Sequence, residues 1–182
     1  YHLAVSQSSD PTAGWWVWNN LRNDLDTNWI DYPELGVSNR GVYFTGNYLN
    51  LSNDGWPTPP QFHDATLWVM NKAAMLTGGG FSIYTFDDLL LDDGSRAHFL
   101  TPSQTVGVPG GAENFVCAFR STATATRCQV YGVTLPVNFP TGAPGLSLNT
   151  VDGPLIPTLA NAPQLGGPSL IETWNVGSPP MN

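Results

Sequence analysis

The sequence predicts an all-β protein built from short antiparallel strands, and three observations support that prediction. The 182 residues include 19 glycines and 16 prolines without a low-complexity tract, which is typical of many short elements joined by turns. Short runs rich in β-branched and aromatic residues, such as "ATLWVM" and "FSIYTF", are bounded by turn-forming residues. A motif of Pro followed closely by Gly also recurs along the chain.

The strand-like runs follow one another with short gaps. Several are nearly continuous apolar stretches, which suit strands that are covered on both faces. The segment "MNKAAMLTGGG" predicts a helix of one or two turns, because the glycines at 78–80 end it. Strands are expected near residues 2–7, 14–19, 35–38, 41–48, 66–71, 81–86, 104–108, 114–120, 127–134 and 145–151.

The recurring motif has a regular spacing. It occurs in "IDYPELGV", "LTPSQTVGV" and "NAPQLGG", and Pro33, Pro102 and Pro163 are 69 and 61 residues apart. Each of the first two copies is followed by three more strand-like runs. One period therefore holds about four antiparallel strands, the content of a β-propeller blade. A sandwich of ten short strands is the weaker interpretation, because it predicts no such period.

Several segments also resemble a known group of proteins. "LAVSQSSDPTAGWWVW", "WIDYPELGVSNRGVYFTGN", "ATLWVMNKAAMLTGG" and "NAPQLGG" are similar to motifs of a poorly characterised group of large secreted bacterial β-propeller proteins with sialidase-like Asp-box-type turns. The resemblance covers most of the chain. The motifs are structural, so the resemblance implies a fold and no activity.

The resemblance implies a propeller portion with two full blades flanked by two partial ones. The expected blades are residues 1–20 (the end of one blade), 29–87, 101–151 and 163–182 (the start of a fourth). A closed propeller needs at least four blades. The expected partners are therefore the remaining blades of a longer precursor or further copies of this chain.

The segment "SSDPTAGW" echoes an Asp-box turn through Ser8, Asp10, Gly14 and Trp15, although Asp10 and Gly14 are two residues too far apart. We expect a structural turn: the Asp side chain binds backbone N–H groups, Gly permits a positive φ, and Trp packs below.

The composition excludes some classes of function. Only 11% of residues are charged, the net charge is −8 and Lys72 is the sole lysine, which argues against nucleic-acid binding. No apolar stretch approaches the ~18 residues of a membrane span. The first residues, "YHLAV", include no basic n-region, so no signal peptide is visible. The lysine-poor acidic composition, together with a disulfide, favours a secreted or cell-surface protein.

The two cysteines predict a cross-strand disulfide. "FVCAFRSTATATRCQVYGV" is typical of two strands joined by a turn centred near Thr122 and Ala123, which places Cys117 directly opposite Cys128. Two free half-buried thiols are the alternative. Neither cysteine has metal-ligating partners at a suitable spacing.

Loops at one end of the blades are expected to bind ligand, by the general rule of the propeller fold. Aromatic planes beside carboxylates and a few cations suit carbohydrate. The alternative is an ordinary polar loop surface in which Trp56 packs under its own loop. The candidate residues are Trp29, Asp31, Tyr32, Trp56, His63, Asp64, Arg96 and His98.

No catalytic constellation is visible. The chain lacks G-x-S-x-G, a phosphate loop, locally paired carboxyls and the arginine cluster of sialidases. We therefore expect a non-catalytic binding, adhesion or assembly module, whose partners include glycan or another extracellular protein. The alternative is a portion of an extracellular glycoside hydrolase or lyase completed by blades outside this chain. No cofactor is expected, except that Ca²⁺ is a candidate at the acidic loop holding Asp87, Asp88, Asp92 and Asp93.

Overall fold

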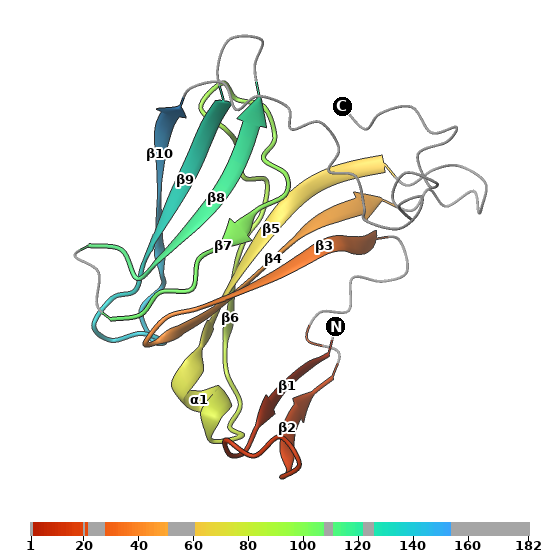
Figure 1. Ribbon diagram of the computed structural model, residues 1–182, viewed down its shortest axis with the longest axis vertical. Coiled ribbons are helices and arrows are strands. Elements are labelled where there is room, and N and C mark those ends of the chain that lie inside the picture. Colours follow the sequence, from red (N-terminus) through yellow and green to blue (C-terminus); the bar gives the residue numbers. More distant parts are fainter. Residues whose placement is uncertain are drawn as a thin grey trace, which may run out of the picture.

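The computed structural model describes residues 2–19, 21, 28–50, 61–107, 111–121 and 126–153 (Figure 1). These residues form three antiparallel sheets, so the all-β prediction is confirmed. The N-terminal hairpin pairs β1 (Leu3–Ser6) with β2 (Trp15–Trp18). The central sheet has the order β3 (Asn28–Val37), β4 (Gly41–Asn50), β5 (Gln61–Asn71) and β6 (Ile83–Phe86). The C-terminal sheet has the order β7 (Thr101–Pro102), β8 (Asn114–Ser121), β9 (Thr126–Thr134) and β10 (Gly145–Gly153).

The expected runs match strands with one exception. The prediction of a strand at 104–108 was wrong, because β7 ends at Pro102 and the chain then leaves its own sheet. The backbone N–H of Thr105 donates to the Val37 carbonyl of the central sheet at 2.8 Å, and Gln104 forms a parallel bridge with Val37. The short helix is α1 (Lys72–Leu76), which Asn71 caps and which gives way to Gly78 at φ 69°.

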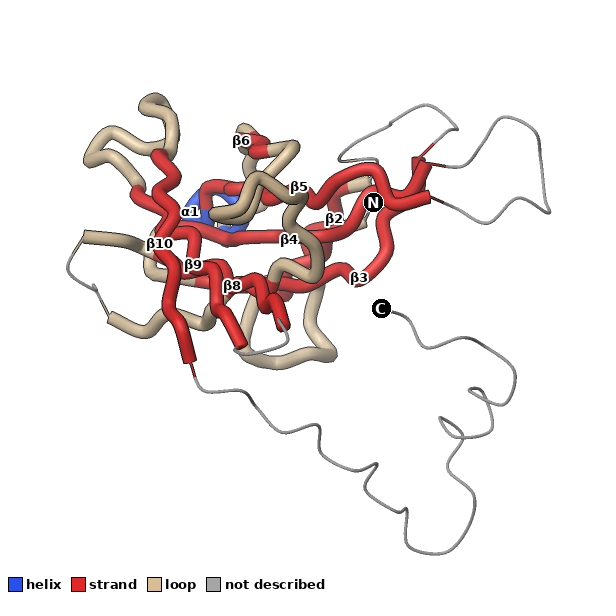
Figure 2. The backbone as a smooth tube through the Cα atoms, turned by 90° about the horizontal axis from the view of Figure 1, so that it is seen from above, coloured by secondary structure: helices blue, strands red, loops and turns tan. Residues whose placement is uncertain are grey.

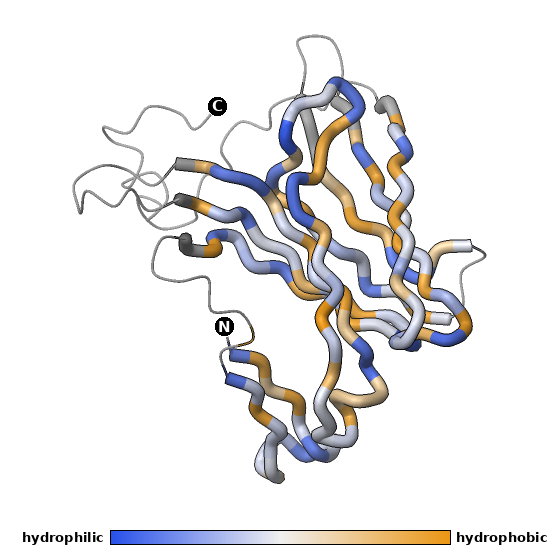
Figure 3. The backbone as a smooth tube through the Cα atoms, turned by 180° about the vertical axis from the view of Figure 1, so that it is seen from behind, coloured by the Kyte–Doolittle hydropathy of each residue, from blue (hydrophilic) through white to orange (hydrophobic). Residues whose placement is uncertain are grey.

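The central sheet packs against the C-terminal sheet, and the N-terminal hairpin lies beside α1 (Figures 1 and 2). On β5, Leu67 and Val69 pack towards the C-terminal sheet, whereas Met70 packs with Val42 of β4 towards the hairpin. Every residue from 64 to 70 is consequently buried, as the apolar run predicted. The chain between β6 and β7 fills the space between the two four-stranded sheets with Leu89, Leu91, Ala97 and Leu100. Figure 3 shows apolar residues along the strands of all three sheets.

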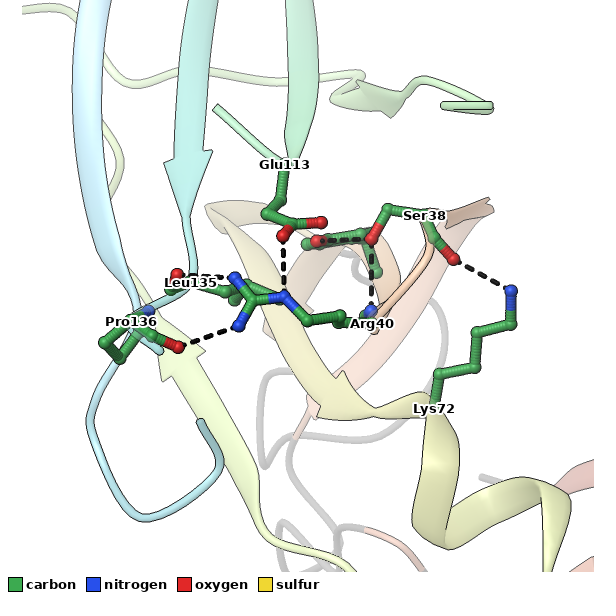
Figure 4. A network of polar contacts seen from close by, with 8 residues as sticks. Ser38, Arg40, Lys72, Glu113, Leu135 and Pro136 are labelled. Carbon is green, nitrogen blue, oxygen red and sulfur yellow. Dashed lines mark hydrogen bonds and ion pairs between the residues drawn. The ribbon is translucent and has the colours of Figure 1, made fainter. Parts of the chain in front are cut away.

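A polar clasp at the β3–β4 turn joins the two four-stranded sheets (Figure 4). The Arg40 guanidinium donates to Glu113 Oε1 at 2.7 Å, to the Pro136 carbonyl at 2.9 Å and to the Leu135 carbonyl at 2.6 Å. Beside it, Lys72 Nζ donates to the Ser38 carbonyl at 2.8 Å. The clasp therefore fixes one end of the sheet-to-sheet contact through charge-assisted hydrogen bonds.

The first strands of the two four-stranded sheets lie side by side. A Cβ on Gly36 of β3 would sit 2.6 Å from Pro102 Cβ and 2.7 Å from the Ser103 carbonyl oxygen. Only glycine permits this approach without movement. The Gln104 side chain adds a bond from Nε2 to the Leu35 carbonyl at 2.8 Å.

The predicted disulfide is wrong. Cys117 lies opposite Val130 and Cys128 lies opposite Phe119, so the two cysteines are diagonal neighbours and their thiols are free. The pairing of Ser121 with Thr126 centres the hairpin one residue further along the chain than the expected centre at Thr122 and Ala123. This offset takes Cys117 and Cys128 out of direct opposition. Burial, followed by the neighbouring Cys128 thiol, raises the pKa of Cys117 to about 11.

Among the residues described, none of the helical structure is long and apolar enough to cross a membrane.

Candidate binding site

Four ring side chains meet at the end of the central sheet where β3 and β5 begin, and we call this group the aromatic end. Tyr32 and Phe99 form an edge-to-face pair with ring centroids 4.8 Å apart. His98 lies 5.0 Å from Phe99 and 6.2 Å from Phe62. Tyr32, Phe99 and Phe62 are 56%, 46% and 41% exposed. Segments from β3, β5 and the β6–β7 connection thus build one exposed apolar surface with a polar ring within it.

Two β-bulges place these side chains. The β3–β4 register breaks between Asp31 and Glu34, where Tyr32 and Pro33 together lie opposite Gly46, so β3 has one extra residue. The β4–β5 register breaks between Tyr48 and Leu49, so His63 is extra on β5. A bulge redirects side chains out of the regular alternation. Both bulges lie at the same end of the sheet, next to the aromatic residues.

Tyr32 and Phe99 both have left-handed backbone conformations, with φ 56° and 52°. Such conformations cost non-glycine residues about 1–3 kcal/mol each and concentrate at functional sites. The structure holds Phe99 through its backbone N–H, which donates to Oδ1 of the buried Asn47 at 3.0 Å. Next to it, the buried Thr45 hydroxyl donates to the Leu100 carbonyl at 2.5 Å. The central sheet therefore holds the backbone at Phe99, whose ring contacts that of Tyr32.

Charged groups flank the aromatic end. His63 Nδ1 lies 3.5 Å from Asp64 Oδ2, and the Asp64 residue is only 5% exposed. Among the described residues, the buried Oδ1 of Asp64 has no hydrogen-bond partner. Arg96 lies 3.5 Å from Asp88 on the β6–β7 connection. Asp31 is exposed on β3 beside Tyr32.

The structure brings together part of the set expected from sequence. Tyr32 and His98 join the aromatic end, and His63 and Asp64 follow Phe62 directly on β5. Trp29 belongs to β3, but its side chain is outside the described part, and Trp56 lies outside the described residues altogether. Sequence reasoning missed Phe62 and Phe99, although each is next to a candidate histidine.

The candidate aspartates for Ca²⁺ do not converge. Asp87 Oδ1 accepts from the Thr66 hydroxyl at 2.7 Å, and Asp92 Oδ2 accepts from the Thr150 hydroxyl at 3.2 Å. Asp93 Oδ1 accepts from the backbone N–H of Ser95 at 3.0 Å, whereas Asp88 faces Arg96. Within the described ranges, no three His, Cys, Asp or Glu side chains gather in a way that could hold a metal ion.

The Asp10 turn between β1 and β2 makes the contacts expected of a hairpin clasp. Asp10 Oδ1 accepts from the Thr12 hydroxyl at 2.7 Å and from its N–H at 2.9 Å, which lowers the pKa of Asp10. Ser8 Oγ accepts from the Asp10 N–H at 3.1 Å. The expected role of Gly14 was wrong, because its φ is not positive. A Cβ at Gly14 would lie 2.7 Å from Gln7 Oε1, the end of a flexible side chain that can move away. The Trp15 indole contacts the turn, since its Nε1 donates to the Pro11 carbonyl at 3.2 Å, and the residue is 48% exposed.

A cavity of about 190 Å³ lies between the hairpin, α1 and the central sheet, and no sequence motif predicted it. Its walls are apolar except for Lys72, whose ammonium donates to the Ser38 carbonyl. It offers no convergent polar groups that would fix the orientation of a ligand. The lining residues are Leu3, Ala4, Val5, Leu35, Val37, Val42, Lys72, Met75 and Leu76.

Comparisons of the chain with protein-family models, with curated proteins and with solved structures find no match.

Proposed function

We propose that this chain is a non-catalytic portion of an extracellular β-propeller whose aromatic end binds glycan. Each four-stranded sheet follows the chain order from its first strand to its fourth, which is the connectivity of a propeller blade. The parallel bridge between Val37 and Gln104 also supports the proposal, since it sets the first strands of the two sheets side by side.

The observation that carries the binding proposal is the pair of exposed rings at Tyr32 and Phe99. A sugar presents an apolar ring face to aromatic planes and hydroxyls to nearby polar groups. Asp31, His63 and Arg96 are polar side chains on the segments that carry the rings. The bond from the Phe99 N–H to Asn47 holds the backbone that carries this ring, and such preorganisation lowers the entropic cost of binding.

An array of neutral and acidic oligosaccharides tests this function. We expect the wild-type chain to bind a subset of the array and the Tyr32→Ala/Phe99→Ala variant to lose that binding. Trp15→Ala is the matched control, because Trp15 is exposed to nearly the same degree as Phe99 but lies in the hairpin. An array without signal from the folded wild-type chain would overturn the proposal.

One observation favours the second function, an extracellular glycoside hydrolase or lyase. Asp64 is a buried carboxylate with an unpartnered oxygen, and glycoside hydrolysis uses a pair of carboxyls. Under this alternative, turnover of a chromogenic glycoside would be measurable and would disappear in Asp64→Asn. Absence of turnover across a panel of such glycosides supports the non-catalytic proposal.

A further inference from the structure

Two free thiols lie next to each other on the face of the C-terminal sheet that points away from the central sheet. On β8, Val116 and Ala118 are buried in the core between the two sheets, so the intervening Cys117 points to the opposite face. Cys117 pairs with Val130 of β9, and Cys128, two residues before Val130, points to the same face. Both cysteines are partly exposed, so neither thiol is enclosed in the core.

The diagonal position of the two thiols suits a bridging cation better than a direct bond between the sulfurs. Diagonal neighbours on a sheet have Cβ atoms roughly 6–7 Å apart, whereas a disulfide needs about 3.8 Å. The two thiols nevertheless interact: burial, then the charge of Cys128 and a hydrogen bond with its thiol, raise the pKa of Cys117 to about 11. A metal–thiolate bond is about 2.3 Å long, so one cation can bridge two sulfurs about 4 Å apart.

The number and type of the donors select the cation. Among the residues that the structure describes, no group of three His, Cys, Asp or Glu side chains could hold a metal ion, so the pair offers two sulfur donors. Structural Zn²⁺ takes four ligands, whereas soft thiolates also select Cu(I). Val130 lies opposite Cys117 and Val151 lies opposite Cys128, and such apolar neighbours limit the access of water. The net charge of −8 attracts cations to the chain.

We propose that Cys117 and Cys128 bind one Cu(I) ion between their sulfurs. On binding, two S–H bonds break and two S–Cu bonds form, two protons pass to solvent, and copper stays in the +1 state. The one-residue offset of the β8–β9 hairpin produces the diagonal arrangement on which the proposal rests. The proposal is independent of glycan binding.

Anaerobic titration of the reduced full chain with Cu(I), in competition with the chromogenic chelator bicinchoninate, tests the site. We expect one Cu(I) per chain by native mass spectrometry. Cys117→Ser and Cys128→Ser should each weaken binding about a hundredfold, because a single thiol loses the advantage of two linked donors. The apparent affinity of the wild-type chain should rise about tenfold or more per unit of pH near neutrality, since binding releases protons.

The matched control, Cys128→Ser/Val151→Cys, keeps two thiols on the same face but separates them. Val151 lies on β10 directly opposite Cys128, so the introduced thiol is two strands away from Cys117, roughly 10 Å. We expect this variant to bind Cu(I) as weakly as Cys128→Ser does. Circular dichroism checks that each variant is folded.

A control variant that binds Cu(I) as tightly as the wild-type chain would overturn the proposal, because the spacing of the thiols would not matter. One copper shared between two chains, or two coppers on one chain, would also overturn it. So would a folded, reduced wild-type chain that takes no Cu(I) from bicinchoninate.

Discussion

At the residue scale, the candidate binding site contains two residues, Tyr32 and Phe99, whose backbone conformation is energetically costly. Both residues adopt left-handed conformations that their side chains disfavour, and both present rings to solvent while touching each other. A core contact does not explain this cost, because the rings are about half exposed. The proposed glycan binding accounts for this cost as the ordering of a binding surface. The sequence indicated Tyr32 but gave no sign of its φ.

Asp10 provides a prediction that belongs to this scale. Its pKa is lowered from 3.8, first by the Thr12 hydroxyl and then by the Thr12 N–H. Because the folded pKa lies below the unfolded value, the stabilisation is present above the unfolded pKa and is lost as the pH falls through the folded pKa. In a carboxyl NMR titration we expect an Asp10 midpoint below 3.8.

Replacement of Thr12 separates the two causes. Thr12→Ala should move the Asp10 midpoint upward, whereas Thr12→Ser keeps the hydroxyl and should leave it low. An Asp10 midpoint that is the same in both variants would show that the hydroxyl does not lower the pKa.

At the scale of elements, the contact between the central and C-terminal sheets depends on a few positions. Arg40 binds a carboxylate and two carbonyls of the C-terminal sheet, and the planar guanidinium suits that geometry better than an ammonium. Arg40→Lys should lower the free energy of unfolding by about 1–3 kcal/mol, measured by urea denaturation.

Arg96→Lys is the matched control for Arg40→Lys. Arg96 forms a pair with Asp88 at 3.5 Å, and both side chains are largely exposed. Exposed pairs contribute little, so the control should change stability by less than about 0.5 kcal/mol. Equal losses in the two variants would mean that the clasp does not hold the sheets together.

Gly36 gives a second test of the same contact. Gly36→Ala puts a Cβ within 2.6 Å of Pro102 Cβ and should destabilise the fold by about 1–3 kcal/mol, because the first strands must separate. Gly80→Ala is the control, since no heavy atom lies within 4 Å of its Cβ position and its φ is not positive. Thermal unfolding of both variants measures the difference. A Gly36→Ala variant as stable as the control would contradict the close approach.

At the scale of the whole molecule, the sequence predicted the positions of the strands better than the pairing of residues between them. Alternating and continuous apolar runs locate nine of the ten expected strands, because burial on one or both faces leaves a pattern in the chain. The expected strand at 104–108 failed because a tertiary partner, Val37, takes the backbone bond of Thr105. The cysteine pairing failed because the hairpin is centred one residue later than expected, which pairs Cys117 with Val130 and Cys128 with Phe119.

The sequence predicted only some of the residues that form the candidate site. The expectation that certain loops lie at one end of the strands grouped Tyr32, His63 and His98 together. Phe62 and Phe99 could not be selected in this way, because their exposure depends on two bulges and a positive φ that arise from pairing with distant strands. Loop order therefore indicated which side chains lie near one another, whereas tertiary geometry determined which rings form the exposed surface.

Calorimetry of the oligosaccharide that binds best on the array tests the central claim most directly. We expect Tyr32→Ala and Phe99→Ala each to raise Kd about tenfold, equivalent to ~1.4 kcal/mol, while Trp15→Ala leaves Kd within about twofold. A Kd that does not change in the first two variants, or that rises equally in all three, would contradict glycan binding at the aromatic end.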